Sequence, residues 1–464
     1  MTKRNSLWIF IIFFSGLVLS SGIARADLAK FSICSNGFTQ QTPDISGNIV
    51  VWSDGRYGNY DIYGFDLSDS SEFIVSNAGS DQSQPAVSGD FVVWVDNRDY
   101  SSNSYDIYGC DISDSCEIVI CDNSFDQQYP AISGNTVIWR DKRNYTSGNS
   151  YDIYGLSLPD LNDFAICTNS SGQYYLDIDG DTVVWMDGRN ADNDIYGYNL
   201  TDESEVMICN ASGGQWYPKI SGQIVVWQDD RNGNDDIYGI DLSTLPGGSE
   251  FEICTNSSSQ SNPVISGDIV VWKDQRNDDG DIYGYNLATG TEFAVCTDSG
   301  EQKSPAIDGD VIVWEYNGDI YGARIPEPSV ITVVSPNGGE MILAGSDDFI
   351  QWQSSGPVGN FVRIEYSTNN GQDYTVVDPN VENSGFFEWQ PVTAADSNQC
   401  LVSISDRDNS ETIDTSDDLF TLFLCDPNLT ADLTGDCYVN MEDFAKFSDQ
   451  WLKCGNQYDP NWCN

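Results

Sequence analysis

The sequence has 464 residues and is strongly acidic, with 72 Asp and Glu against 20 Lys and Arg and a formal net charge of −52. This charge argues against nucleic acids and anionic lipid surfaces as partners, because proteins bind both through Lys and Arg. The sequence contains no histidine, which excludes His-dependent nucleophilic triads and His-ligated metal sites. The abundant carboxylates favour solubility and leave oxygen ligands for divalent cations such as calcium.

The first 26 residues have the composition of a signal peptide for secretion. Lys3 and Arg4 precede an apolar stretch over residues 7–19, and Ala24-Arg25-Ala26 is typical of a cleavage site. We expect cleavage before Asp27 and a mature protein that is secreted or displayed on the cell surface, without insertion into the membrane. The alternative is an uncleaved membrane anchor, for which the apolar stretch is short.

A sequence motif that is repeated seven times dominates residues 27–326. In each copy a Trp closes an apolar run, and Asp-Ile-Tyr-Gly follows after a turn. The Trp residues are Trp52, Trp94, Trp139, Trp185, Trp227, Trp272 and Trp314, and the Asp-Ile-Tyr-Gly copies begin at Asp61, Asp106, Asp152, Asp194, Asp236, Asp281 and Asp319. A period of 42 to 46 residues with short β-type runs is typical of a β-propeller with one four-stranded blade per repeat.

The count of strands predicts how the ring closes. Each of four strand types occurs seven times, but the first copy of the last type, over residues 31–34, precedes the first complete repeat, and the final repeat stops after three strands. The N-terminal strand can therefore complete the last blade and leave no open edge. We predict a mainly β protein with a seven-bladed propeller closed in this way.

The repeated Trp-x-Asp-x-Arg and Asp-Ile-Tyr-Gly motifs resemble the TolB-like propeller repeats of bacterial surface proteins. The resemblance covers residues 28–326 and implies a propeller domain over residues 27–326. A propeller hosts many unrelated functions, so the resemblance predicts architecture rather than activity.

Residues shared by the repeats are predicted to build the ring. We expect the Trp and Tyr to pack between blades and the Asp–Arg pair, which six copies retain, to fix a turn. Six cysteines recur at one position and are interpreted as small buried fillers, too far apart for disulfides: Cys34, Cys121, Cys167, Cys209, Cys254 and Cys296. Cys110 and Cys116 flank a short turn, where a disulfide could cross-link the hairpin.

The candidate ligand site lies where the repeats differ. A Gln recurs before the first strand of every repeat, and beside it three consecutive repeats carry aromatic residues. The candidate residues are Tyr129, Tyr174, Tyr175, Trp216 and Tyr217, together with Gln127, Gln173 and Gln215. Aromatic rings beside amides suit stacking on a sugar face or on a peptide. The alternative is that the Gln residues only join neighbouring blades by hydrogen bonds.

Residues 327–424 are predicted to form a second domain. A Pro-containing linker precedes short alternating runs, among them residues 349–352, 361–366 and 401–404, with turns between them. This spacing is typical of a β-sandwich. The stretch from Ser335 to Tyr374 resembles immunoglobulin-like modules of secreted and cell-wall proteins.

The tail, residues 425–464, carries the most specific local motif. Oxygen-bearing side chains stand at positions 1, 3, 5, 9 and 12 of a loop that precedes a helix-type pattern, with a backbone carbonyl expected at position 7. The candidate calcium ligands are Asp432, Thr434, Asp436, Tyr438, Asn440 and Asp443.

This loop resembles one calcium-loop–helix half of a type I dockerin. The resemblance implies a cohesin-like protein partner and a setting of polysaccharide degradation. Two departures weaken it: Cys437 replaces the usual Gly, and the second loop of a dockerin is missing. The alternative is an acidic helix cap with Asp443 in the first turn. The tail also holds Cys425, Cys437, Cys454 and Cys463, whose pairing the spacing does not determine.

The sequence favours a non-catalytic binding protein over an enzyme. The propeller would recognise a protein or a glycan, and the tail would be a calcium-dependent docking module. The first alternative is a polysaccharide-active hydrolase or lyase, although no pair of carboxylates stands out for that chemistry. The second alternative is a structural adhesion protein.

Overall fold

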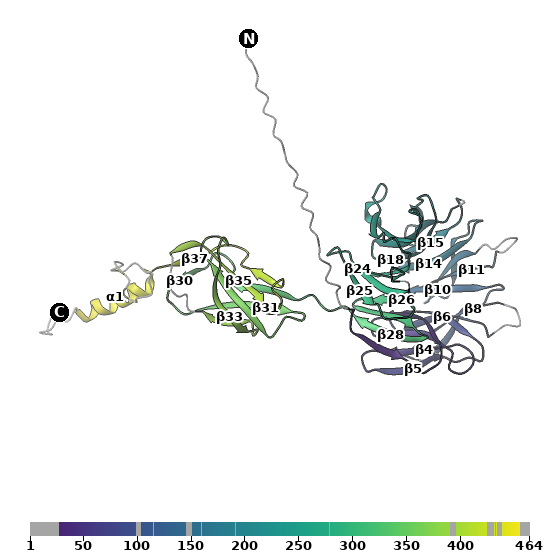
Figure 1. The fold of residues 1–464 in the computed structure, drawn as a ribbon, viewed down its shortest axis with the longest axis horizontal. Helices are drawn as coiled ribbons and strands as arrows, with labels where there is room; N and C mark the ends of the chain where they lie inside the picture. The colour runs from purple at the N-terminus through teal and green to yellow at the C-terminus, as the bar shows by residue number, and fades with distance from the viewer. Residues whose placement is uncertain are drawn as a thin grey trace, which may run out of the picture. The chain divides into compact units, whose positions relative to one another are not determined.

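The computed structural model describes residues 27–98, 104–114, 116–144, 151–158, 160–190, 192–277, 279–389, 396–424, 431, 433 and 439–454. The predicted signal peptide lies outside these residues. The chain divides into two compact units, residues 1–325 and 326–464, and the described part is mainly β (Figure 1). Within the described residues, no helix is long and apolar enough to span a membrane.

In its described residues, the first unit contains seven four-stranded antiparallel sheets. The first three sheets are β2 (Gln40–Ser46), β3 (Ile49–Asp54), β4 (Asp61–Asp66) and β5 (Ser71–Ser76); β6 (Gln82–Ser88), β7 (Phe91–Asp96), β8 (Asp106–Asp111) and β9 (Cys116–Cys121); and β10 (Gln127–Ser133), β11 (Thr136–Asp141), β12 (Asp152–Ser157) and β13 (Asp163–Cys167).

The next three are β14 (Gln173–Asp179), β15 (Thr182–Asp187), β16 (Asp194–Asn199) and β17 (Ser204–Cys209); β18 (Gln215–Ser221), β19 (Ile224–Asp229), β20 (Asp236–Asp241) and β21 (Phe251–Cys254), with the short 3-10 helix η2 (Leu242–Thr244); and β22 (Gln260–Ser266), β23 (Ile269–Asp274), β24 (Asp281–Asn286) and β25 (Thr291–Cys296). The seventh sheet joins both ends of the unit: β26 (Gln302–Asp308), β27 (Val311–Tyr316), β28 (Asp319–Arg324) and, as its outer strand, β1 (Lys30–Cys34).

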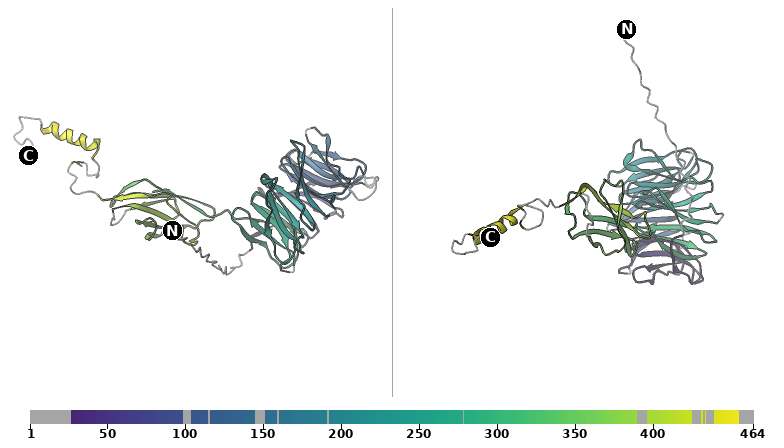
Figure 2. Two further views of the ribbon diagram at one scale, coloured as in Figure 1. Left: turned by 90° about the horizontal axis from the view of Figure 1, so that it is seen from above. Right: turned by 60° about the vertical axis from the view of Figure 1, so that its left-hand side comes forward.

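The seven sheets close into a ring. The first strand of each sheet contacts the first strand of the next, and β26 contacts β2. At one end of these strands, a Ser or Asp side chain of each sheet accepts a hydrogen bond from the backbone N–H of a Gly in the following sheet, with seven such bonds at 2.6–3.0 Å. The bond from Gly47 to Asp308 joins the first sheet to the seventh. Figure 2 shows the sheets side by side.

The core of the ring lies between neighbouring sheets. All seven repeated Trp side chains are fully buried, each among residues of two sheets; Trp272, for example, packs with Val226 and Ile237 of the preceding sheet. The prediction that these Trp pack between repeats is therefore confirmed.

The described part of the second unit contains two sheets and a C-terminal helix. One sheet has the order β29 (Val330–Ser335), β31 (Asp348–Ser355), β34 (Phe386–Trp389). The other has the order β30 (Met341–Leu343), β37 (Phe420–Phe423), β35 (Ser397–Asp406), β32 (Phe361–Ser367), β33 (Thr375–Glu382), and β36 (Ile413–Thr415) also pairs with β35. Side chains of both sheets form one apolar cluster, which includes Trp352, Val362 and Ile404. The helix α1 spans Met441–Cys454.

The register of β8 and β9 argues against a disulfide between Cys110 and Cys116. Cys110 faces Glu117 across the ladder, whereas Cys116 faces Asp111, so the two cysteines are not cross-strand partners. Among the side chains that the structure describes, no disulfide is formed. The side chains of Cys116 and Cys454 lie outside the described part, as do Cys425, Cys437 and Cys463.

Candidate binding site at the mouth of the central channel

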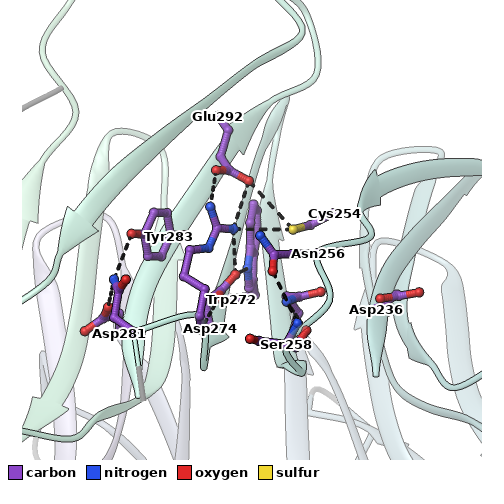
Figure 3. Close-up of polar contacts among 12 residues, drawn as sticks. Asp236, Cys254, Asn256, Ser258, Trp272, Asp274, Asp281, Tyr283 and Glu292 are labelled. Carbon is purple, nitrogen blue, oxygen red and sulfur yellow. Dashed lines mark hydrogen bonds and ion pairs between the residues drawn. The ribbon is translucent and has the colours of Figure 1, made fainter. Parts of the chain in front are cut away.

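The repeated Asp–Arg pair is part of a cluster of bonded side chains within its sheet, which we name the clamp and which Figure 3 shows in the sixth sheet. The carboxylate of Asp274 accepts hydrogen bonds from Trp272 Nε1 at 2.9 Å and from Arg276 Nη2 at 2.7 Å. The Arg276 guanidinium also pairs with Glu292 and lies 4.1 Å from the centroid of the Tyr283 ring. The same Asp–Arg bond recurs in the first five sheets, so the repeated Asp and Arg fix the turn between the second and third strands of these sheets.

The repeated cysteines adjoin this clamp. Cys254, in the fifth sheet, lies 3.5 Å from Arg276 Nη2 of the sixth (Figure 3). Burial, reinforced by the nearby Glu292, raises the pKa of Cys254 to about 12. Its thiol therefore stays protonated and unreactive at neutral pH. The six cysteines are buried and free, as expected of fillers, and five of them also contact an arginine of the next sheet.

The three predicted glutamines do not line the channel. The side chains of Gln127, Gln173 and Gln215 are fully buried, which keeps them from direct contact with a ligand. Their backbone N–H groups donate to carbonyls of the preceding sheet, for example from Gln173 to Tyr151 at 3.0 Å. Their Nε2 atoms donate to carbonyls of their own loops. The Gln side chains thus bond within their own loops, and only their backbone N–H groups join neighbouring sheets.

A β-bulge two residues after each Gln aims one side chain into the channel. The register shifts there in the first strand of all seven sheets, and the bulged residue has φ between 50° and 54°, which is uncommon for residues other than Gly. These residues form a ring at the channel mouth: Thr42, Gln84, Tyr129, Tyr175, Tyr217, Asn262 and Ser304.

Three of the predicted aromatics meet in this ring. The ring centroids of Tyr175 and Tyr217 are 4.0 Å apart, and those of Tyr129 and Tyr175 are 6.4 Å apart in an edge-on arrangement. Burial and the neighbouring Tyr175 raise the pKa of Tyr217, so its hydroxyl stays protonated. We name Tyr129, Tyr175 and Tyr217 the tyrosine crescent.

The other two predicted aromatics lie beside the crescent. Tyr174 packs over Gly172, and Trp216 packs over Gly214, where a Cβ would lie 2.2 Å from the indole. Neither side chain lines the channel. Tyr174 still contacts the crescent, because its ring centroid is 6.4 Å from that of Tyr175.

Arg140 packs against the crescent without lining the channel. This residue was not identified from the sequence. Its guanidinium lies 4.1 Å from the Tyr129 centroid and 4.2 Å from that of Tyr151, close enough for cation–π attraction to both rings. Its Nη2 donates to Gln128 Oε1 at 2.6 Å. The arginine therefore fixes Tyr129 at the mouth.

Deeper in the channel, three charged residues interrupt a ring of Ala and Val. Lys219 Nζ lies 3.0 Å from Asp177 Oδ1, while Asp177 Oδ2 accepts the N–H of Ile220 at 2.9 Å. Burial alone would lower the pKa of Lys219, but the adjacent Asp177 holds it above its usual value. Burial raises the pKa of Asp44 to about 6, even though Val87 N–H donates to it.

The channel can bind a ligand that is polar and not anionic. Its volume is about 490 Å³, which suits a small molecule or one protruding group of a larger ligand. Its described lining carries Asp44, Asp177, Asp179 and Asp308 against Lys219 alone. The charged residues could have been found from the sequence, because Asp44, Asp177 and Lys219 stand at a position that is Ala or Val in the other four repeats.

The predicted calcium loop is described only in part. Asp432, Thr434, Asp436 and Tyr438 lie outside the described residues. Asp443 is buried and accepts the N–H of Leu433 and of Asn440, both at 2.8 Å. Asn440 Oδ1 accepts the N–H of Glu442 at 2.6 Å, as an N-cap does. The two ends of the loop are thus tied together, and the all-oxygen donor set fits calcium.

Comparisons with known proteins support the fold. No family model matches the sequence, and no curated protein matches it. Among solved structures, the β-propeller domain of the Trilobed protease from Pyrococcus furiosus has 10% identity and a TM-score of 0.50, over 63% of this chain and 94% of that one. TolB from Acinetobacter baumannii has 17% identity and a TM-score of 0.42, over 56% of this chain and 67% of that one.

An acylaminoacyl peptidase has 11% identity and a TM-score of 0.46, over 66% of this chain and 60% of that one. At such identities the likeness concerns the fold alone. The first unit is therefore a β-propeller, as predicted, with an acidic channel whose mouth is partly aromatic.

Proposed function

We propose that the chain is a secreted or surface-displayed, non-catalytic binding protein. Its first unit would be a seven-bladed propeller, closed by β1, that recognises a protein or a glycan at the tyrosine crescent. The observation that carries this proposal is the crescent itself. Three adjacent sheets present Tyr at a channel position where the other four present Thr, Gln, Asn or Ser. Clustered, partly exposed rings supply contact area at a small cost in entropy.

A test compares two variants of the same ring. Replacing Tyr129, Tyr175 and Tyr217 by Ala should weaken binding to array glycans or peptides at least tenfold, since stacking is lost. The matched control replaces Asn262 and Ser304, which have the same backbone conformation on the same ring, and should change affinity less than twofold. Equal binding by the parent and the crescent variant would refute the site.

The enzyme alternative draws on Asp44, whose pKa of about 6 would suit a general acid. Hydrolysis of a glycoside needs two carboxylates with separate roles. Asp177, however, is tied to Lys219 and to the N–H of Ile220, which leaves it poorly placed for proton transfer. We therefore favour binding over catalysis. If the protein released reducing sugar from a bound glycan and Asp44→Asn abolished that release, we would favour catalysis instead.

For the second unit we propose an immunoglobulin-like sandwich followed by a calcium-dependent docking tail. The shared core of its two sheets supports the first part. The tied ends of the loop support the second, together with the exposed Met441, Phe444 and Phe447 on α1. The partner would be a cohesin-like protein, and the setting would be polysaccharide degradation. A purely adhesive role is the remaining alternative.

Calorimetry on the whole protein tests the tail. Calcium should bind with micromolar to millimolar affinity, and replacing Asp432 and Asp436 by Ala should abolish the binding heat, because two ligands are lost. Asp449→Ala, which lies in α1 beyond the loop, should leave the heat unchanged. No heat from the parent at millimolar calcium would overturn the metal assignment.

A further inference from the structure

The seventh sheet differs from the others in one turn. β27 and β28 are joined by Asn317 and Gly318 alone, whereas at least six residues join the corresponding strands of every other sheet. Their φ values of 56° and 83° suit a two-residue Asn-Gly hairpin turn. The long loop that covers this edge in the other sheets is therefore missing between the seventh and the first sheet.

A cleft of about 600 Å³ opens at this place. Its walls come from the β1–β2 loop with Phe38 and Thr39, from the β3–β4 loop, and from the short turn. Four of its eleven lining residues are Gly, so backbone groups are accessible along its floor. The cleft is separate from the channel, because the two share no lining residue.

Asp319 lines this cleft and differs from the aspartates that begin the other six Asp-Ile-Tyr-Gly copies. The six equivalent aspartates are at most 7% exposed, and five of them accept a hydrogen bond from a nearby Asn side chain, such as Asn277 to Asp281 at 2.6 Å. Asp319 is more exposed. In the described part of the chain, no side chain donates a hydrogen bond to it. Its carboxylate is thus partly desolvated, which raises its pKa, yet it retains acceptor capacity for a ligand.

The rim of the cleft combines an aromatic ring with a second carboxylate. Phe38 is 54% exposed, so part of its ring is accessible to a ligand. Asp81 accepts the N–H of Tyr60 through Oδ1 at 2.9 Å, and its side chain is exposed. Among the described residues that line the cleft, none is Lys or Arg. The described side chains of the lining therefore offer no positive charge to an anionic ligand.

We propose that this cleft is a second binding site, which takes one or two neutral sugar units of a glycan. The exposed face of Phe38 stacks on the apolar face of a pyranose ring. Asp319 and Asp81 accept hydrogen bonds from sugar hydroxyls, which are stronger because the acceptors are ionised. The two carboxylates and the net charge of the chain exclude glycans rich in uronic acids.

The test uses the mature full-length protein and an array of neutral oligosaccharides, followed by titration calorimetry with the best of them. Phe38→Ala and Asp319→Ala should each weaken binding at least tenfold. Since no described side chain donates a hydrogen bond to Asp319, its variant should keep the parental melting temperature. Phe125→Ala is the matched control, because Phe125 stands at the equivalent loop position two residues before Gln127, is 48% exposed, and lies in a sheet with a long turn. It should change affinity less than twofold.

The remaining outcomes distinguish the cleft from the channel and from a metal site. Binding that survives Phe38→Ala but is lost in the crescent variant would place the sugar in the channel and overturn the proposal. Failure of every neutral oligosaccharide to bind would overturn it as well, as would calcium binding at Asp319 without any sugar. If Phe38→Ala loses sugar binding while the crescent variant still binds, the result would support the cleft even if the channel proposal fails.

Discussion

A protein that lacks residues 27–34 is expected to lose on the order of 5 kcal/mol of folding free energy and about 10 °C of melting temperature. β1 pairs with β28 along the outer edge of the seventh sheet. Ile33 and Cys34 are buried in the closing interface, and Phe31 packs where Gly322 leaves room for its ring. Without β1 these groups are lost, and β28 becomes an open edge.

Local contacts add to this effect. Asp27 accepts hydrogen bonds from the N–H and hydroxyl of Thr297 at 2.7 and 3.0 Å. Lys30 pairs with Asp298 and lies 5.4 Å from the Tyr321 centroid, where the other sheets place the clamp arginine. Calorimetric melting of the truncated protein measures the loss. A synthetic peptide of residues 27–37 should restore most of it, and an unchanged melting temperature without peptide would show that β1 does not close the ring.

The propeller could be predicted from the sequence because seven copies report the same local pattern. The buried Trp side chains and the strand that begins with each Asp-Ile-Tyr-Gly fall where the period predicts. The partners of Cys110 were harder to predict from the sequence. The spacing of six residues between Cys110 and Cys116 suggested a disulfide, whereas the ladder places Cys110 opposite Glu117 and Cys116 opposite Asp111. Spacing does not reveal cross-strand register, and one residue of slip changes every partner.

The candidate site was only half predictable. Tyr175 and Tyr217 were found because they break the repeat, but their aim into the channel depends on a bulge. No Gly marks that bulge, since Thr, Gln, Tyr, Asn and Ser all adopt positive φ there. The inward neighbours Asp44 and Lys219 were missed although they too break the repeat, because four other copies have Ala or Val at that position. The direction of a strand's side chains can be read only after its bulges are known.

Asp274→Ala is expected to lower the free energy of unfolding by about 2–3 kcal/mol, because it removes the buried partner of Arg276 and leaves the indole N–H of Trp272 without its acceptor. Asp274 is fully buried and accepts hydrogen bonds from Trp272 Nε1, Arg276 N and Arg276 Nη2. After the substitution, the buried indole N–H of Trp272 has lost its acceptor, and the Arg276 guanidinium keeps, of its two carboxylates, only the more exposed Glu292. Denaturant unfolding measures the change as a shift of the midpoint at constant slope.

The matched control is Asp310→Ala. Asp310 pairs with Arg324 at 3.2 Å, but the two side chains are 53% and 49% exposed, and such a pair contributes about 1 kcal/mol or less. Arg276→Lys separates charge from geometry, since Lys keeps the charge but cannot bridge Asp274, Glu292 and Cys254 together. It should cost nearly as much as Asp274→Ala. If both clamp variants unfold like the Asp310 variant, the repeated Asp–Arg pair does not stabilise the fold.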